Sequence, residues 1–183
     1  KTSDLYQNLL EALRTAGDAD LPVRVDLREL KALVLSARLR LQPDYDWEIV
    51  SAAVRAELLA RFGFDRRALG QPVLLCEVIA AIQGVRGVDY VDVEHLAGIA
   101  QVVAGPAPGA GEEGGRHFVT QDDIVDTIRD LLQPPASEGA PTPVLPADVD
   151  AWPGGVDRGV LRPAELVVFV PGVADTLVLN PIS

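Results

Sequence analysis

The chain of 183 residues is long enough for one domain of ordinary size, or one domain and a small lobe, and its 48% apolar content is ample for a buried core. Its net charge of −11 is uneven: residues 1–96 hold twelve Lys and Arg against fifteen Asp and Glu (−3), and residues 97–183 hold four against twelve (−8). An acidic second half repels phosphate backbones, which argues against nucleic acid as a partner.

Other features of composition concern membranes, chain ends and redox chemistry. No apolar run approaches the roughly twenty residues that span a bilayer, and no charged-then-apolar leader opens the chain, so we expect no membrane insertion. Met is absent throughout, so Lys1 is expected to be an internal position of a longer polypeptide. The single cysteine, Cys76, lies among apolar residues and is predicted to be a buried, inert thiol.

Residues 1–29 are predicted to form an N-terminal helix and a linker. Leucines recur at helical spacing between Ser3, a suitable N-cap, and Gly17, where the run ends. Asp18, Asp20 and Pro22 then indicate a turn, and Val23 and Val25 are interpreted as a brief strand.

The stretch from residue 30 to 97 predicts the main structural unit, in the order strand, helix, helix, strand. Alternating apolar and polar residues predict the first strand, with Ser36, Arg38 and Arg40 on its solvent-exposed face. The buried face carries Leu33, Leu35, Ala37, Leu39 and Leu41.

Helical periodicity follows this strand. Asp44 or Asp46 caps a helix that begins near Trp47, buries one apolar stripe and ends at Gly63. The buried stripe is Trp47, Val50, Val54, Leu58 and Phe62. Gly70 and Pro72 are expected to open a second helix, which Gly84 and Gly87 end.

A second strand over residues 88–93 is expected to return antiparallel to the first, with Asp89 and Asp92 exposed. The predicted class is therefore α+β, a small sheet covered on one side by two helices. A terminal β-hairpin, residues 165–170 and 175–179 with a turn at Pro171 and Gly172, is expected to join that sheet, so that residues 160–183 belong to the same domain.

Residues 98–159 are interpreted as an insertion with one helix and a Pro/Gly-rich linker lying on a surface. Thr120 offers an N-cap for a helix over residues 120–132, and prolines from Pro134 to Pro153 interrupt any regular ladder beyond it. Trp152 in this linker is expected to occupy an apolar groove, either on its own domain or on a neighbour.

Several ordered phrases in this chain resemble the carboxy-terminal part of baseplate J-like proteins, the baseplate assembly proteins of contractile phage tails and phage-tail-like injection systems. The resemblance covers residues 5–99 and the tail. The phrases are Pro43-Asp44-Tyr45-Asp46, Phe62-Gly63-Phe64-Asp65, Ala68-Leu69-Gly70-Gln71-Pro72-Val73, Glu77-Val78-Ile79-Ala80-Ala81-Ile82-Gln83-Gly84-Val85, Gly87-Val88, Val91-Asp92-Val93, Leu161-Arg162-Pro163-Ala164-Glu165-Leu166 and Leu177-Val178-Leu179-Asn180.

The resemblance implies a structural wedge component and no enzymatic activity or cofactor. Its partners would be other baseplate proteins and copies of itself, joined in a ring around the tail hub and coupled to the sheath. It would lie in the bacterial cytoplasm during assembly and then in the tail or particle. The candidate contacts are Arg66, Arg67, Trp152, Leu177 and Leu179, the two leucines lying on the exposed edge of the expected terminal hairpin. A local salt bridge from the arginine pair to Asp65 or Glu57 is the simpler interpretation of Arg66 and Arg67.

The alternative function is a small enzyme or a metal- or ligand-binding domain. It would use the acidic helix 120–132, where Asp122, Asp126 and Asp130 share one side, or His95. Strand alternation would place Asp92 on the face opposite His95, which favours an ordinary surface histidine. The glycines of residues 109–114 formally match a dinucleotide fingerprint, but two carboxylates occupy the turn and no helix follows it directly.

Overall fold

The computed structural model describes residues 3–18, 23, 25–100, 102–104, 116–118, 125–127, 146–157, 160–170 and 176–182. The elements are α1 (Asp4–Ala16), β1 (Glu29–Leu41), α2 (Trp47–Phe62), the short 3₁₀ helix η1 (Phe64–Arg66), α3 (Leu75–Gln83), β2 (Val88–Ala100), β3 (Val102–Ala104), β4 (Arg116–Phe118), β5 (Gly155–Asp157), β6 (Val160–Arg162), β7 (Glu165–Val168) and β8 (Leu177–Pro181). The predicted α+β class is confirmed.

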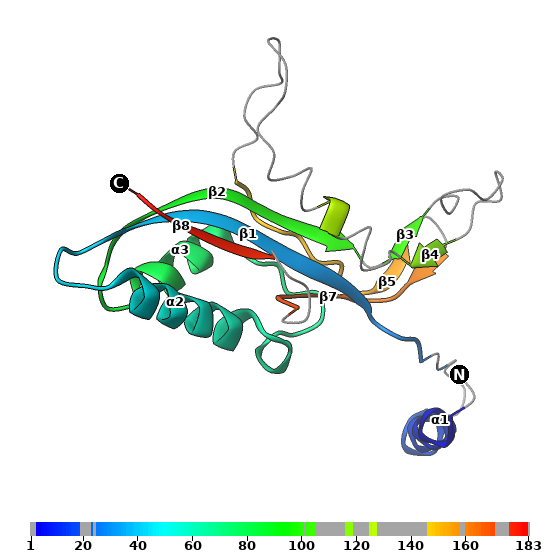
Figure 1. Ribbon diagram of the computed structural model, residues 1–183. Coiled ribbons are helices and arrows are strands. Elements are labelled where there is room, and N and C mark those ends of the chain that lie inside the picture. The colour runs from blue at the N-terminus through cyan, green and yellow to red at the C-terminus, as the bar shows by residue number, and fades with distance from the viewer. Residues whose placement is uncertain are drawn as a thin grey trace, which may run out of the picture.

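The main sheet is built around β1. β2 pairs with it in antiparallel register along one edge, as predicted, whereas β7 and β8 both pair with the other edge. Figure 1 shows α2 and α3 together on one face of this sheet, and α1 apart from it at the end opposite the C-terminus. The prediction of a sheet covered on one side by two helices is therefore correct.

The predicted terminal hairpin is wrong, although its two strands do join the sheet. Both run parallel to β1: β7 pairs with Glu29–Ala32 and β8 with Leu35–Leu39, so they follow one another along the same edge. A hairpin would pair the two short strands with each other and leave backbone groups along this edge of β1 without partners. Pairing both with β1 satisfies those groups, and the short antiparallel pairs are instead β3 with β4 and β5 with β6.

The core lies between the sheet and the two helices. The predicted face of β1 is buried from Leu33 to Leu39, and the apolar stripe of α2 packs on it. The buried residues of α2 are Val50, Val54, Leu58 and Phe62. The ring of Phe62 meets that of Phe169 edge to face, with centroids 6.2 Å apart, which joins α2 to the residue after β7.

The two helices begin in different ways. Asp46 caps α2 by accepting from the backbone N–H of Glu48 at 2.9 Å, which decides between the two candidate caps. α3 begins at Leu75, later than Gly70 and Pro72 suggested, and its first N–H donates to the carboxylate of Asp148 at 2.7 Å. This capping side chain is distant in sequence, so no local pattern indicates it.

The segment that carries Asp148 is part of the core. Val149 pairs with Val73 in an antiparallel bridge and is 7% exposed. The expectation that this linker lies on a surface is therefore wrong here, because it supplies both a helix cap and a core side chain. Two further expectations fail: Val23 and Val25 lie outside any strand, and the thiol of Cys76 is exposed on the outer side of α3.

A bulge in β2 changes which side chains share the face of the sheet away from the helices. The register with β1 shifts between Ser36 and Ala37, so His95 pairs with Ser36 while Asp92 pairs with Arg38. Asp92 and His95 thus lie on the same face, and the sequence interpretation that alternation separates them is wrong. Ser36, expected to be wet, is buried and donates to Glu94 at 3.1 Å.

Gly87, between α3 and β2, adopts φ +100°, and a Cβ there would lie 2.5 Å from Cδ1 of Tyr45. We expect Gly87→Ala to lower the free energy of unfolding by roughly 1–2 kcal/mol, because alanine is strained at this φ and crowds the ring. Urea unfolding would measure it. Gly84→Ala is the control, since Gly84 has ordinary helical φ and ψ; equal losses would contradict the prediction.

Candidate functional site

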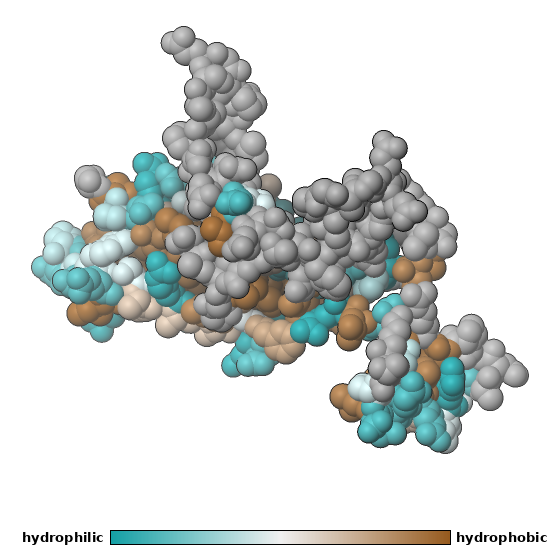
Figure 2. All heavy atoms as spheres, turned by 45° about the vertical axis from the view of Figure 1, so that its right-hand side comes forward, coloured by the Kyte–Doolittle hydropathy of each residue, from teal (hydrophilic) through white to brown (hydrophobic). Residues whose placement is uncertain are grey.

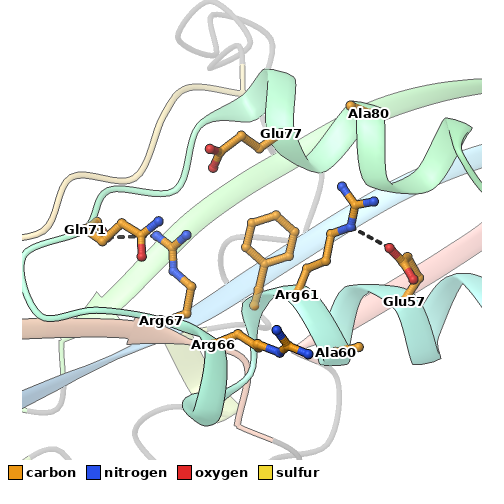
Figure 3. Close-up of a pocket in the computed structure, with 9 residues that line it drawn as sticks. Glu57, Ala60, Arg61, Arg66, Arg67, Gln71, Glu77 and Ala80 are labelled. Carbon is orange, nitrogen blue, oxygen red and sulfur yellow. Dashed lines mark hydrogen bonds and ion pairs between the residues drawn. The ribbon is translucent and has the colours of Figure 1, made fainter.

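The connection between α2 and α3 forms one wall of a pocket of about 550 Å³, called here the corner pocket. The last turns of α2, the residues around η1 and the outer side of α3 line it (Figure 3). The lining residues are Glu57, Ala60, Arg61, Phe62, Arg66, Arg67, Gln71, Glu77 and Ala80. The predicted contact pair, Arg66 and Arg67, therefore lies in a concave site and not on a flat surface.

Arg67 is held by the loop that follows it. Its Nη2 donates to the carbonyl oxygens of Gln71 and Pro72, at 2.8 and 2.6 Å, and its guanidinium lies 5.7 Å from the ring centroid of Phe62. Burial lowers the pKa of Arg67, and the nearby charge of Glu77 opposes that shift. The buried Nε–H of Arg67 has no hydrogen-bond partner among the residues that the structure describes. Arg67 is thus a fixed, partly desolvated cation.

The other arginines of the corner pocket differ in their pairing. Arg61 forms an ion pair with Glu57 one turn earlier on α2. Arg66 is exposed, and its side chain makes no hydrogen bond or ion pair within the described part of the chain. The predicted local salt bridge from the Arg66–Arg67 pair to Asp65 or Glu57 is therefore not formed, because Glu57 already binds Arg61.

Trp152 lies on its own domain. Its backbone N–H donates to the carboxylate of Glu165 at 3.0 Å, and its carbonyl oxygen accepts from the N–H of Glu165 at 2.8 Å. The guanidinium of Arg162 stacks over its ring at 5.3 Å. The Trp152 side chain is half-buried on its own chain, so only part of its surface is available to a neighbouring subunit.

Leu177 and Leu179 belong to the core, with 7% and 8% of their surface exposed. Their side chains are therefore not available to a partner, contrary to the prediction. The edge of β8 is also partly blocked: Arg55 of α2 donates to the carbonyl oxygen of Leu177 at 2.8 Å, and Pro181 has no N–H to offer.

The residues of the alternative site are not brought together in the described part of the chain. Asp126 lies in a helical segment at residues 125–127, whereas Asp122 and Asp130 are outside the described residues, as are residues 109–114. Beside His95, the carboxylates of Asp92 and Glu94 pair with Arg38 at 2.6 and 2.9 Å. Among the described residues, no group of three or more His, Cys, Asp or Glu side chains is arranged to hold a metal ion.

A second surface, which the sequence analysis did not single out, is the apolar stripe of α1. The helix begins at the predicted Ser3 cap, yet none of its residues is buried, and Leu5, Leu9 and Leu13 are 79%, 46% and 40% exposed. Brown apolar side chains are visible on α1 in Figure 2. The sequence showed the amphipathic spacing of this helix, which predicts that its apolar face is packed. The spacing does not specify whether that face packs on the same chain or on another molecule.

Comparison of the chain with family models, with curated proteins and with solved structures found no match. Within the described ranges, no helix combines the length and the apolar character needed to cross a membrane.

Proposed function

We propose that this chain is a structural component of the baseplate of a contractile phage tail or phage-tail-like injection system. In this role it contacts other baseplate proteins and copies of itself in a ring around the hub, and it couples that ring to the sheath. The phrases that resemble baseplate J-like proteins support this choice of machine, and they lie on the strands, the helices and the loops that connect them.

The exposed stripe of α1 is the observation that carries the proposal. A 13-residue helix is marginally stable in water unless its apolar face is packed, and here no residue of α1 is buried. Full burial of a leucine contributes about 1.5–3 kcal/mol, so Leu5, Leu9 and Leu13 together offer substantial binding energy. A helix of this kind is suited to packing against a neighbouring subunit.

The test is recovery in the assembled particle. The tagged chain, expressed in the cells that encode it, should be present in purified tails or injection particles and should co-purify with their sheath and baseplate proteins. Its absence from purified particles would refute the proposal.

Truncating the α1 leucines should uncouple the chain from the particle while leaving its core intact. We expect Leu5→Ala, Leu9→Ala and Leu13→Ala together to reduce incorporation at least tenfold, because about 1.4 kcal/mol corresponds to a tenfold change and three leucines are shortened. Quantitative mass spectrometry of purified particles would measure this. Asn8→Ala with Glu11→Ala on the polar side is the matched control, and equal incorporation of both variants would exclude α1 as the contact.

A further inference from the structure

We propose that the corner pocket binds a carboxylate of an acidic polypeptide segment. This inference concerns a different surface from α1 and does not depend on the identity of the particle.

The charge around the corner pocket is the first argument. Three arginines and two glutamates line it, which is a local excess of positive charge in a chain of net charge −11. Glu57 is engaged with Arg61, and Glu77 forms no ion pair with Arg67 within the described residues. Arg66 and Arg67 therefore retain cationic donors that form no ion pair with a carboxylate of the described chain, although the charge of Glu77 acts on Arg67.

The geometry of Arg67 is the second argument. Two backbone carbonyls of the loop after Arg67 hold its guanidinium in place. A ligand that binds there therefore does not have to immobilise a flexible side chain, which lowers the entropic cost of binding. In Figure 3 the side chains of Arg61 and Arg67 extend toward α3, where Glu77 lies across from them, and Arg66 lies beside Ala60 at the end of α2. Guanidinium groups bind carboxylates through paired, charge-assisted hydrogen bonds.

Neighbouring apolar side chains indicate that the carboxylate belongs to a polypeptide. Phe64 and Leu69 flank the arginine pair in sequence and are each 55% exposed, and Ala60 and Ala80 give the pocket apolar walls. The guanidinium of Arg28 lies 4.9 Å from the centroid of the Phe64 ring. Arginine beside exposed aromatic and aliphatic groups is typical of protein interaction sites, and a volume of about 550 Å³ accepts more than a small ion.

The probe is the acetylated and amidated peptide EELE, titrated into the ¹⁵N-labelled chain and followed by NMR of the arginine Nε–H and backbone signals. We expect saturable shifts at Arg66, Arg67 and Leu69, and none with the neutral peptide QQLQ. Arg66→Gln should weaken binding at least about fivefold, because a charge-assisted hydrogen bond is lost. Since the side chain of Arg66 is exposed and forms no hydrogen bond or ion pair in the described chain, this variant should retain the wild-type backbone spectrum.

Arg14→Gln is the matched control, because it removes the same charge from α1, away from the pocket. It should change the affinity for EELE by less than about twofold if the site is local and not a response to net charge. Equal weakening by both variants, equal binding of QQLQ, or no saturable shift would overturn the proposal. Stronger binding of inorganic phosphate than of EELE at the same signals would overturn it too, in favour of a small-anion site.

Discussion

Replacing Leu58 with alanine is expected to lower the free energy of unfolding by about 2–5 kcal/mol. Leu58 lies at the centre of the α2 stripe, is fully buried, and packs in the core between the helices and β1. The variant loses both the transfer free energy of the removed methyl groups and the contacts around the cavity that remains. Urea unfolding followed by circular dichroism would measure the change.

Leu59→Ala is the control for this prediction. It makes the same chemical change one residue further along α2, where the side chain is 37% exposed. Both variants alter helix propensity equally, so their difference reports burial alone. We expect a loss below about 1 kcal/mol for Leu59→Ala. Equal losses at the two positions would show that the inner face of α2 is misassigned.

Replacing Glu165 with glutamine is expected to lower the free energy of unfolding at pH 7 by about 2–3 kcal/mol. Glu165 is 7% exposed and joins three segments: it accepts from Lys31 Nζ of β1 at 2.7 Å and from the N–H of Trp152 at 3.0 Å, beside Arg162 of β6. The amide keeps the shape but leaves the ammonium of Lys31 without its counter-charge.

The effect of Glu165→Gln should depend on pH. Burial by itself would raise the pKa of Glu165, but the hydrogen bonds from Lys31 and Trp152 and the charges of Lys31 and Arg162 outweigh it, so the pKa lies below its ordinary value. A lowered folded-state pKa contributes stability above the unfolded pKa of about 4.3, and this contribution is lost as the pH falls through the folded pKa. The difference in free energy of unfolding between wild type and variant should therefore be largest at pH 7 and should disappear as the pH falls below about 4.

Glu57→Gln tests whether any glutamate in an ion pair behaves in the same way. Glu57 and Arg61 form an exposed pair one turn apart on α2, and such pairs contribute about 0.3–0.5 kcal/mol. A loss at Glu57 as large as that at Glu165, or a gap at Glu165 that persists unchanged at pH 3, would contradict the assigned role of the buried carboxylate.

The candidate sites were only partly predictable. The sequence correctly singled out the adjacent arginines, Arg66 and Arg67, which line the corner pocket. It did not indicate Arg61, Glu77 or the loop carbonyls, because these come from different elements. Leu177 and Leu179 were assigned to a free edge because a hairpin was expected, and pairing with β1 instead places both in the core. The burial of a strand depends on its partners, which local pattern does not specify.

The sequence by itself determined the elements whose signals are local. The apolar stripe of α2, the Ser3 cap of α1 and the alternation of β1 all follow from patterns within a few residues. Tertiary structure alone decided the contacts made over long distances in the chain: β7 and β8 beside β1, Asp148 on the first turn of α3, and Val149 in the core. These depend on which unpaired backbone groups and apolar surfaces meet when the chain collapses, and many distant segments carry the same local pattern.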